Sequence, residues 1–329
     1  MQRLFSVSGL VSGLVSGLSG LVPVLVLAVA AGCTSSSSDP EIELVKGFDP
    51  PPPAAGYTRY VLPPIKGLRP GEDKLFCQWV EVASPSDVDI VDVMGYQSVT
   101  GHHEVLYSTS ESEAIGTTRE CTTADMISVE FLGGIAGENS ANASKLPEGY
   151  VFRQRKERML LVNAHYLNAT DSIQDVQSVM DIKTAAPSPD RKAVGMAVIN
   201  YLDFQIPANT PSYSVDATCT WPRDTSLIMW SNHMHSNGLS VSSDFTPAGG
   251  APQTLASDPS WQPEAAFNPT WTHWDLSAPM VIHAGDQTHI RCTWQNHTPG
   301  MMAFPDEMCD AVGFYTESTE QQICDAAAM

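Results

Sequence analysis

The chain has 329 residues, which allows one large domain or two domains of about 130–150 residues. It carries 17 basic and 37 acidic residues, a formal net charge of −20. This balance leaves no basic surface to neutralise phosphates, so we expect no nucleic-acid partner.

The first 32 residues have the pattern of a signal peptide. Arg3 is the only charged residue among them, an apolar stretch spans 21–31, and small residues precede Cys33. We expect residues 1–32 to be a bacterial lipoprotein signal and Cys33 to carry the lipid; an uncleaved membrane anchor is the alternative. The protein would then be exported and anchored to a bacterial membrane, at the outer membrane or on the periplasmic face.

Residues 33–56 contain serines at 35–38 and prolines at 50–53. Stretches of this composition do not bury a core, so we interpret 33–56 as a tether. No later segment is long and apolar enough to span a bilayer.

Short segments rich in β-branched and aromatic residues, separated by Pro, Gly, Asn and Asp, predict strands. They lie at 75–82, 105–109, 159–166, 196–206, 226–230 and 288–294. No convincing stretch has a helical period, so the predicted class is all-β, a sandwich or jelly roll. The segment 185–191 contains two prolines and is the best candidate for a linker between an N-terminal domain, 57–190, and a C-terminal domain, 191–329.

Six cysteines remain after the lipidation site: Cys77, Cys121, Cys219, Cys292, Cys309 and Cys324. An even number in an exported protein predicts three disulfides. No two of them are spaced as CxxC, so we expect no cysteine zinc site. The residues themselves do not choose among the possible pairings.

Five histidines and one methionine are the most informative residues, because they occur in the order HH, H, HxH, M. They are His102, His103, His165, His233, His235 and Met308. Imidazole suits copper, zinc and iron, whereas a thioether suits Cu(I) and adds little for zinc. The candidate linker divides the six into two sets of three, which predicts two copper sites, one in each domain. A single buried histidine is more often structural, so the prediction depends on the complete ordered set.

The spacing within each pair predicts its local structure. Residues i and i+2 of a strand share a face, so His233 and His235 can bind one metal from one strand. Adjacent residues diverge on a regular strand, so His102 and His103 need a bulge or a strand end to converge.

Further segments match a known family at 74–77, 146–153, 285–286, 291–293 and 306–309. With them, residues 57–329 resemble the copper type II, ascorbate-dependent monooxygenases, which include the peptidylglycine α-hydroxylating and dopamine β-monooxygenases. The resemblance implies two tandem antiparallel β-sandwich domains with one copper each. It assigns electron transfer to the copper held by His102, His103 and His165. It assigns the reaction with O₂ and substrate to the copper held by His233, His235 and Met308.

The function implied by the resemblance is that of an oxidoreductase. A copper monooxygenase of this kind hydroxylates a C–H bond of a small organic substrate, using O₂ and ascorbate or another one-electron donor. The resemblance also implies the disulfides Cys77–Cys121, Cys219–Cys324 and Cys292–Cys309.

Some positions depart from the family pattern. Ser231 stands where the peptide-amidating members have Arg, and Asp310 and Val312 stand where they have Asn and Tyr. These changes remove the anchor for a substrate carboxylate and add a negative neighbour, so we do not expect glycine-extended peptides as substrates. Glu104 stands where the amidating members have Met, and the sequence offers no account of it.

Two other functions remain possible from the sequence. A non-catalytic lipoprotein could bind copper for storage, delivery or sensing, although storage alone does not need two different ligand sets. A zinc hydrolase would leave Met308 without a role. Asp306 and Glu307 precede Met308 and are candidates for contacts that orient a ligand, with a solvated turn as the alternative. Asn163 would share a strand face with His165 and is a candidate to orient a water or a reductant. We interpret the remaining histidines as structural: His273, His283, His289 and His297.

Overall fold

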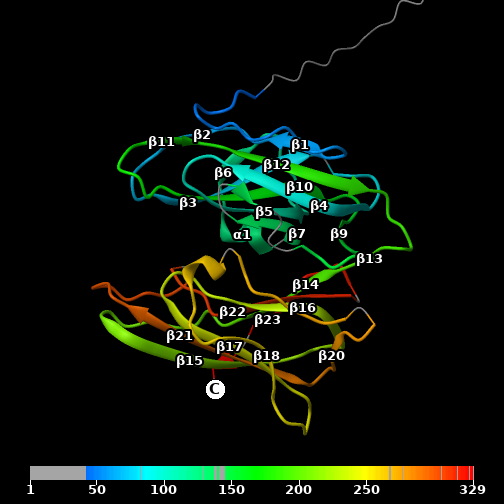
Figure 1. Ribbon diagram of the computed structural model, residues 1–329, viewed down its shortest axis with the longest axis vertical. Coiled ribbons are helices and arrows are strands. Elements are labelled where there is room, and N and C mark those ends of the chain that lie inside the picture. The colour runs from blue at the N-terminus through cyan, green and yellow to red at the C-terminus, as the bar shows by residue number, and fades with distance from the viewer. Residues whose placement is uncertain are drawn as a thin grey trace, which may run out of the picture. The chain divides into compact units, whose positions relative to one another are not determined.

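The computed structural model describes residues 42–329 except 82, 128, 137–138, 141–144, 267, 276, 305, 317, 326 and 329. Ile42–Met329 form one compact unit (Figure 1). The predicted signal, Cys33 and the first part of the tether lie outside the described residues. No described helix has both the length and the apolarity needed to cross a membrane.

The all-β class is confirmed. The helical elements in the described part are short, α1 (Thr123–Ile127) and the 3₁₀ turn η1 (Pro263–Ala266). Strand pairing is antiparallel except for two short parallel pairs, β13 with β9 and β14 with β23.

Two sheets and a small ribbon form the first half of this unit. The six-stranded sheet contains β1 (Thr58–Val61), β12 (Ser178–Ala185), β4 (Val88–Gln97), β9 (Tyr150–Gln154), β13 (Lys192–Ala193) and β8 (Asn139–Ser140). The five-stranded sheet contains β6 (Thr118–Glu120), β3 (Asp73–Glu81), β10 (Met159–Leu167), β5 (Gly101–Thr109) and β7 (Val129–Ala136). The ribbon pairs β2 (Ile65–Leu68) with β11 (Gln174–Val176). Ile90 and Met180 of the first sheet share one apolar core with Leu106 and Val162 of the second, so the two sheets form a sandwich.

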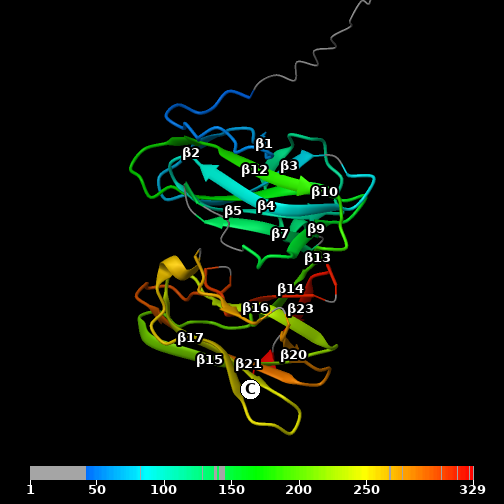
Figure 2. The ribbon, with the colours of Figure 1, turned by 45° about the vertical axis from the view of Figure 1, so that its right-hand side comes forward.

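The second half repeats this arrangement (Figure 2). Its six-stranded sheet contains β19 (Thr272–His273), β16 (Thr225–His233), β22 (Asp310–Tyr315), β14 (Gly195–Asn200), β23 (Gln322–Asp325) and β20 (Met280–Ile282). Its five-stranded sheet contains β18 (Gln253–Asp258), β17 (Gly238–Thr246), β21 (Gln287–Asn296), β15 (Thr210–Thr220) and β24 (Ala327–Ala328). Trp230 and Ala311 from the first of these sheets pack in one core with Ile290 and Trp294 from the second.

The change from one set of sheets to the other falls at Val194. β13 pairs with β9 of the first half, and β14 pairs with β22 of the second half. The preceding segment, where we predicted a linker, is irregular from 186 to 191. Its last residue, Arg191, donates to the buried carboxylate of Asp89 over 2.9 Å, and this ion pair holds the segment against the first sandwich.

The predicted strands correspond to β3, β5, β10, β14, β16 and β21. The strand expected at 196–206 was too long, because β14 ends at Asn200. Beyond it, Phe204 and Ile206 are buried in the second core, and Ile206 forms an isolated bridge with Met302. Apolar residues here mark core packing outside a regular strand.

The three disulfides implied by the family resemblance are present. Cys77–Cys121, Cys219–Cys324 and Cys292–Cys309 have Cα–Cα distances of 5.0, 5.9 and 5.8 Å. They indicate that the protein folds in an oxidising compartment.

Candidate metal centres

Three histidines converge at one end of two paired strands of the first sandwich. On β10 and β5, His165 lies opposite His103, and Tyr166 lies opposite Gly101. His102 is therefore an extra residue in β5, and this is the bulge that the adjacent pair required. His165 Nδ1 lies 3.0 Å from His102 Nδ1 and 3.4 Å from His103 Nδ1. One ligand atom from each of the three residues falls within a 4.8 Å span, so the group could hold a metal ion.

The other ring nitrogen of His165 is in contact with a carboxylate. His165 Nε2 contacts Asp73 Oδ1, and Asp73 is the first residue of β3, opposite Leu167 of β10. Sequence reasoning missed Asp73, because the contact depends on the register between β3 and β10.

Burial keeps the imidazoles of His102 and His103 neutral. Burial first, and then the charge of His165, lower the pKa of His102 to about 4. Burial also holds the pKa of His103 well below its ordinary value, with smaller effects from His165, His102, His233 and His235. Metals bind the neutral form of imidazole, so these two side chains are available as ligands at neutral pH.

The second pair of histidines lies at the end of β16. His233 is the last residue of this strand and His235 lies beyond it, so the expectation that one strand carries both was wrong for His235. The chain turns at 236–237 immediately afterwards. Met234 between them is buried while both histidines are partly exposed, which preserves the alternation of faces. The centroids of the His233 and His235 rings are 5.4 Å apart, which is close enough for both side chains to bind one ion.

The segment that contains Met308 braces His235. The buried carboxylate of Glu307 accepts hydrogen bonds from the backbone N–H groups of His235, at 3.0 Å, and Asn237, at 2.6 Å. His235 Nδ1 lies 3.2 Å from the carbonyl oxygen of Asp306. A carbonyl can only accept, so this contact assigns the proton to Nδ1 and leaves Nε2 free for a metal.

Met308 lies between two residues that touch the histidine segment. Glu307 holds the backbone of His235, and Asp310 lies opposite His233 in the pairing of β22 with β16. Cys309 is tied to Cys292. The residues that flank Met308 are thus tied to the histidine segment and to a disulfide, and the side chain of Met308 itself is partly exposed.

The departures from the family pattern lie beside His233. Ser231 lies opposite Val312 and His233 opposite Asp310, with all four on one face of the paired strands. Asp310 is buried, its Oδ1 has no hydrogen-bond partner, and burial raises its pKa to about 8. A buried carboxyl therefore borders this candidate site.

Other residues proposed from the sequence have structural contacts. Asn163 is buried and its amide donates to Cys121 Sγ over 3.1 Å, so it supports the first disulfide. Glu104 is fully buried in the first sandwich, and a Cβ at Gly95 would lie 2.0 Å from its Oε1, so that glycine makes room for it. Two of the remaining histidines pair with acids at the surface, His289 with Asp216 and His283 with Asp224.

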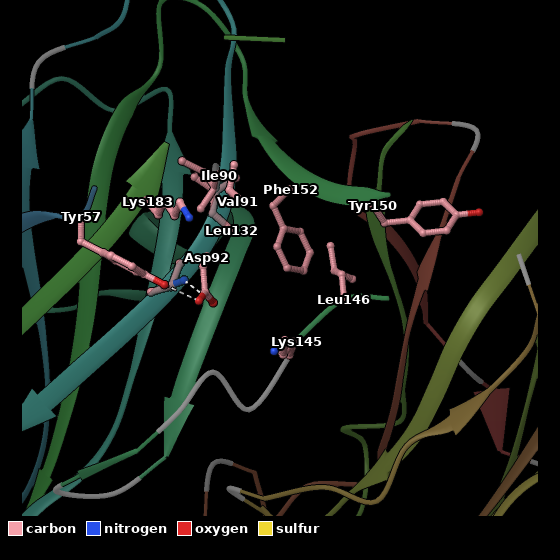
Figure 3. A pocket seen from close by; sticks show the side chains of 11 residues that line it. Tyr57, Ile90, Val91, Asp92, Leu132, Lys145, Leu146, Tyr150, Phe152 and Lys183 are labelled. Atoms are coloured by element: carbon pink, nitrogen blue, oxygen red, sulfur yellow. Dashed lines mark hydrogen bonds between the residues drawn. The ribbon is translucent and has the colours of Figure 1, made fainter. Parts of the chain in front are cut away.

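A cavity of about 160 Å³ lies elsewhere in the first half, lined by residues of β4, β7, β9 and β12 (Figure 3). Among the residues that line it, the Tyr57 hydroxyl donates to Asp92 over 2.5 Å, and Lys183 lies 5.9 Å from the centre of the Tyr57 ring. None of the six candidate ligands lines it.

No model of a protein family matches the chain, and no curated protein matches it. Among solved structures, it is similar to N-glycanase F (PNGase F), with 9% identity over 83% of this chain and 100% of that chain and a TM-score of 0.32. It is also similar to the VP2 subviral particle of infectious bursal disease virus, with 10% identity over 82% and 74% of the two chains and a TM-score of 0.20. Similarity at this level carries no argument about function.

Proposed function

We propose that the protein is an exported copper monooxygenase that hydroxylates a C–H bond of a small organic substrate, with O₂ and an external one-electron donor such as ascorbate. The observation that carries the proposal is the convergence of the His102, His103 and His165 side chains through a bulge. Five of the six predicted ligands fold into one group of three histidines and a separate pair, and this division agrees with the two sets predicted from the sequence.

The donor sets fit copper. Three neutral imidazoles suit copper or zinc, whereas a thioether beside two imidazoles favours Cu(I) and gives zinc little. Copper at these sites would supply the one-electron chemistry that O₂ needs to react with a C–H bond. One oxygen atom would enter the substrate, the other would leave as water, and the external donor would supply the electrons.

The chain's own residues prepare both sites for this role. Burial keeps His102 and His103 unprotonated, and Glu307 and the Asp306 carbonyl hold His235 with Nε2 free. Burial, and then the charge of His235, lower the pKa of His233 to about 3. These three histidines, His102, His103 and His233, therefore need not lose a proton before they bind metal at neutral pH.

The substrate class follows from the surroundings of His233. Ser231 and Asp310 offer no positive charge to a substrate carboxylate. We therefore propose neutral or amine-bearing substrates, and phenethylamines, amides and lipids are the first compounds to test.

The first test is the copper content of the full mature chain. We expect two copper ions per chain, with His102→Ala and His233→Ala each losing about one, and not the same one. Loss of both ions in either variant would mean one shared site.

The second test separates catalysis from copper binding for storage, delivery or sensing. The copper-loaded protein should consume O₂ with ascorbate faster than free copper does, and more so when a substrate is present. Two bound coppers with no substrate-dependent O₂ uptake across the panel would favour the binding protein.

We also propose that Cys33 is lipidated and holds the domain at a bacterial membrane. The disulfides support export to an oxidising compartment. Cys33→Ser should leave the precursor uncleaved or release the protein from the membrane fraction; unchanged cleavage and fractionation would instead indicate an ordinary signal or an anchor.

A further inference from the structure

We propose that Asp73 is a positioning residue for the first copper site: its carboxylate accepts a hydrogen bond from the Nε2–H of His165 and so selects the tautomer that presents Nδ1 to the metal. The inference rests on the proposed copper function and adds a residue that the ligand pattern does not contain.

The geometry places His165 between two neighbouring strands. On one side it lies directly opposite His103 of β5. On the other side, β10 pairs with β3, where Leu167 lies opposite Asp73. His165 and Leu167 share a face because they are two residues apart, so Asp73 is the diagonal cross-strand neighbour of His165.

The two nitrogens of His165 therefore face different partners. Nδ1 lies 3.0 Å from His102 Nδ1 and 3.4 Å from His103 Nδ1. Nε2 contacts the carboxylate of Asp73, which is an acceptor when ionised. A neutral imidazole carries one proton, so a proton held at Nε2 leaves the lone pair at Nδ1, where the other two histidines converge.

The carboxylate also affects which oxidation state is bound. An acceptor on the remote N–H makes the imidazole a stronger donor and fixes its orientation. The negative charge and the stronger donor benefit Cu(II) more than Cu(I). Asp73 should therefore lower the reduction potential of this copper and favour its role as a carrier that gives up its electron.

Asp73 can be changed with little risk to the fold. Its side chain is 62% exposed, whereas that of His165 is 17% exposed. Asp224→Ala is the matched control, because Asp224 is also an exposed carboxylate next to a histidine, His283, at 3.6 Å.

The experiment uses the full mature chain carrying His233→Ala and His235→Ala, so that the measured copper is the one held by His102, His103 and His165. Asp73→Ala in this background should weaken Cu(II) binding about 10- to 100-fold. Cu(I) binding should weaken less, and a tenfold difference corresponds to a rise of about 59 mV in reduction potential. The electron paramagnetic resonance spectrum of Cu(II) should change, Asp73→Asn should be intermediate because its amide oxygen still accepts, and Asp224→Ala should match the background.

Two outcomes would overturn the role of Asp73. Unchanged affinities, potential and spectrum in Asp73→Ala would show that the contact does not act on the metal. Equal loss of Cu(I) and Cu(II) together with a lower melting temperature would show a purely structural contact. If the background protein binds no copper at all, the proposed function fails, and that result is distinct from both.

Discussion

At the scale of single residues, the candidate sites depend on the state of each ring nitrogen. In the first site the carboxylate of Asp73 contacts Nε2 of His165. In the second site the carbonyl oxygen of Asp306 accepts a hydrogen bond from Nδ1 of His235. His165 would therefore present Nδ1 to a metal, whereas His235 would present Nε2. The sequence identifies the imidazoles as candidate ligands, but only the fold shows which neighbouring groups determine where their protons lie.

Met308→Ala tests the thioether. We expect most of the copper to remain, because His233 and His235 provide most of the affinity, while substrate hydroxylation falls by orders of magnitude because the soft ligand favours Cu(I). Met308→His should bind copper at least as tightly and remain poorly active. Copper content and turnover are measured together, with Met301→Ala, at an exposed methionine, as the control. Near-normal turnover in Met308→Ala would remove Met308 from the site.

Asp310→Asn tests the buried carboxyl beside His233. The pKa of Asp310 is raised from 3.8 to about 8 in the folded protein. As pH rises between these values, the unfolded carboxyl ionises while the folded one stays protonated, so the wild type loses stability. Asparagine cannot ionise, so the free energy of unfolding of Asp310→Asn should rise relative to the wild type from pH 5 to pH 8.

Urea unfolding of the copper-free protein at these two pH values checks this prediction. Asp190→Asn, at an exposed position, is the control and should follow the wild type. If the difference in the free energy of unfolding between Asp310→Asn and the wild type is the same at both pH values, Asp310 ionises normally.

At the scale of elements, irregularities at strand ends create the sites. The bulge at His102 brings the adjacent side chains of His102 and His103 together. β16 ends at His233, so His235 lies outside the strand and its backbone contacts Glu307. The disulfide Cys292–Cys309 joins residues 17 apart in the sequence and restrains the segment that leads from Met308 into β22.

Replacing Cys292 and Cys309 together by Ala should destabilise the protein by about 2–5 kcal/mol. It should also reduce turnover more than copper content, because it frees the segment that carries Met308. The matched pair is Cys77 and Cys121, whose loss should affect stability without this selective loss of turnover. Equal effects of the two double variants on turnover would show that the Cys292–Cys309 disulfide has no special relation to Met308.

At the scale of the whole molecule, the two halves of the described unit share apolar contacts. Phe314 of β22 lies 5.6 Å from the ring of Phe131 and 5.0 Å from that of Phe152, which are both in the first half. Met229 of β16 belongs to the same core cluster. The outer face of β16 and β22 thus carries both this apolar contact and, further along, His233 and Asp310.

Phe314→Ala should lower the free energy of unfolding by about 3–5 kcal/mol, because it removes a fully buried aromatic ring. We expect the unfolding transition measured by calorimetry to broaden or split as the halves lose their coupling. Phe304→Ala, at a side chain 46% exposed, is the control and should leave the transition unchanged. If Phe314→Ala changes the free energy of unfolding and the transition no more than Phe304→Ala does, the two halves are stable independently of this contact.

The sequence by itself determined the fold class, the approximate positions of six strands and the choice of six candidate ligands. Alternation of apolar residues and the spacing of turn residues are local signals, so β3, β10 and β21 could be located without any tertiary information. The need for a bulge at His102 also followed from the period of a strand. The disulfide pairing came from the family resemblance, since six cysteines alone allow many pairings.

The tertiary structure decided what depends on contacts between distant segments. Asp73 meets His165 across 92 residues, and Glu307 holds His235 across 72, through register and strand-end geometry that no local pattern encodes. The extent of β14 and the position of His235 beyond β16 were also decided by packing, because buried side chains outside a strand satisfy the same apolar pattern. Residue types identify which atoms can bind a metal, and the pairing of strands decides which of those atoms face one another.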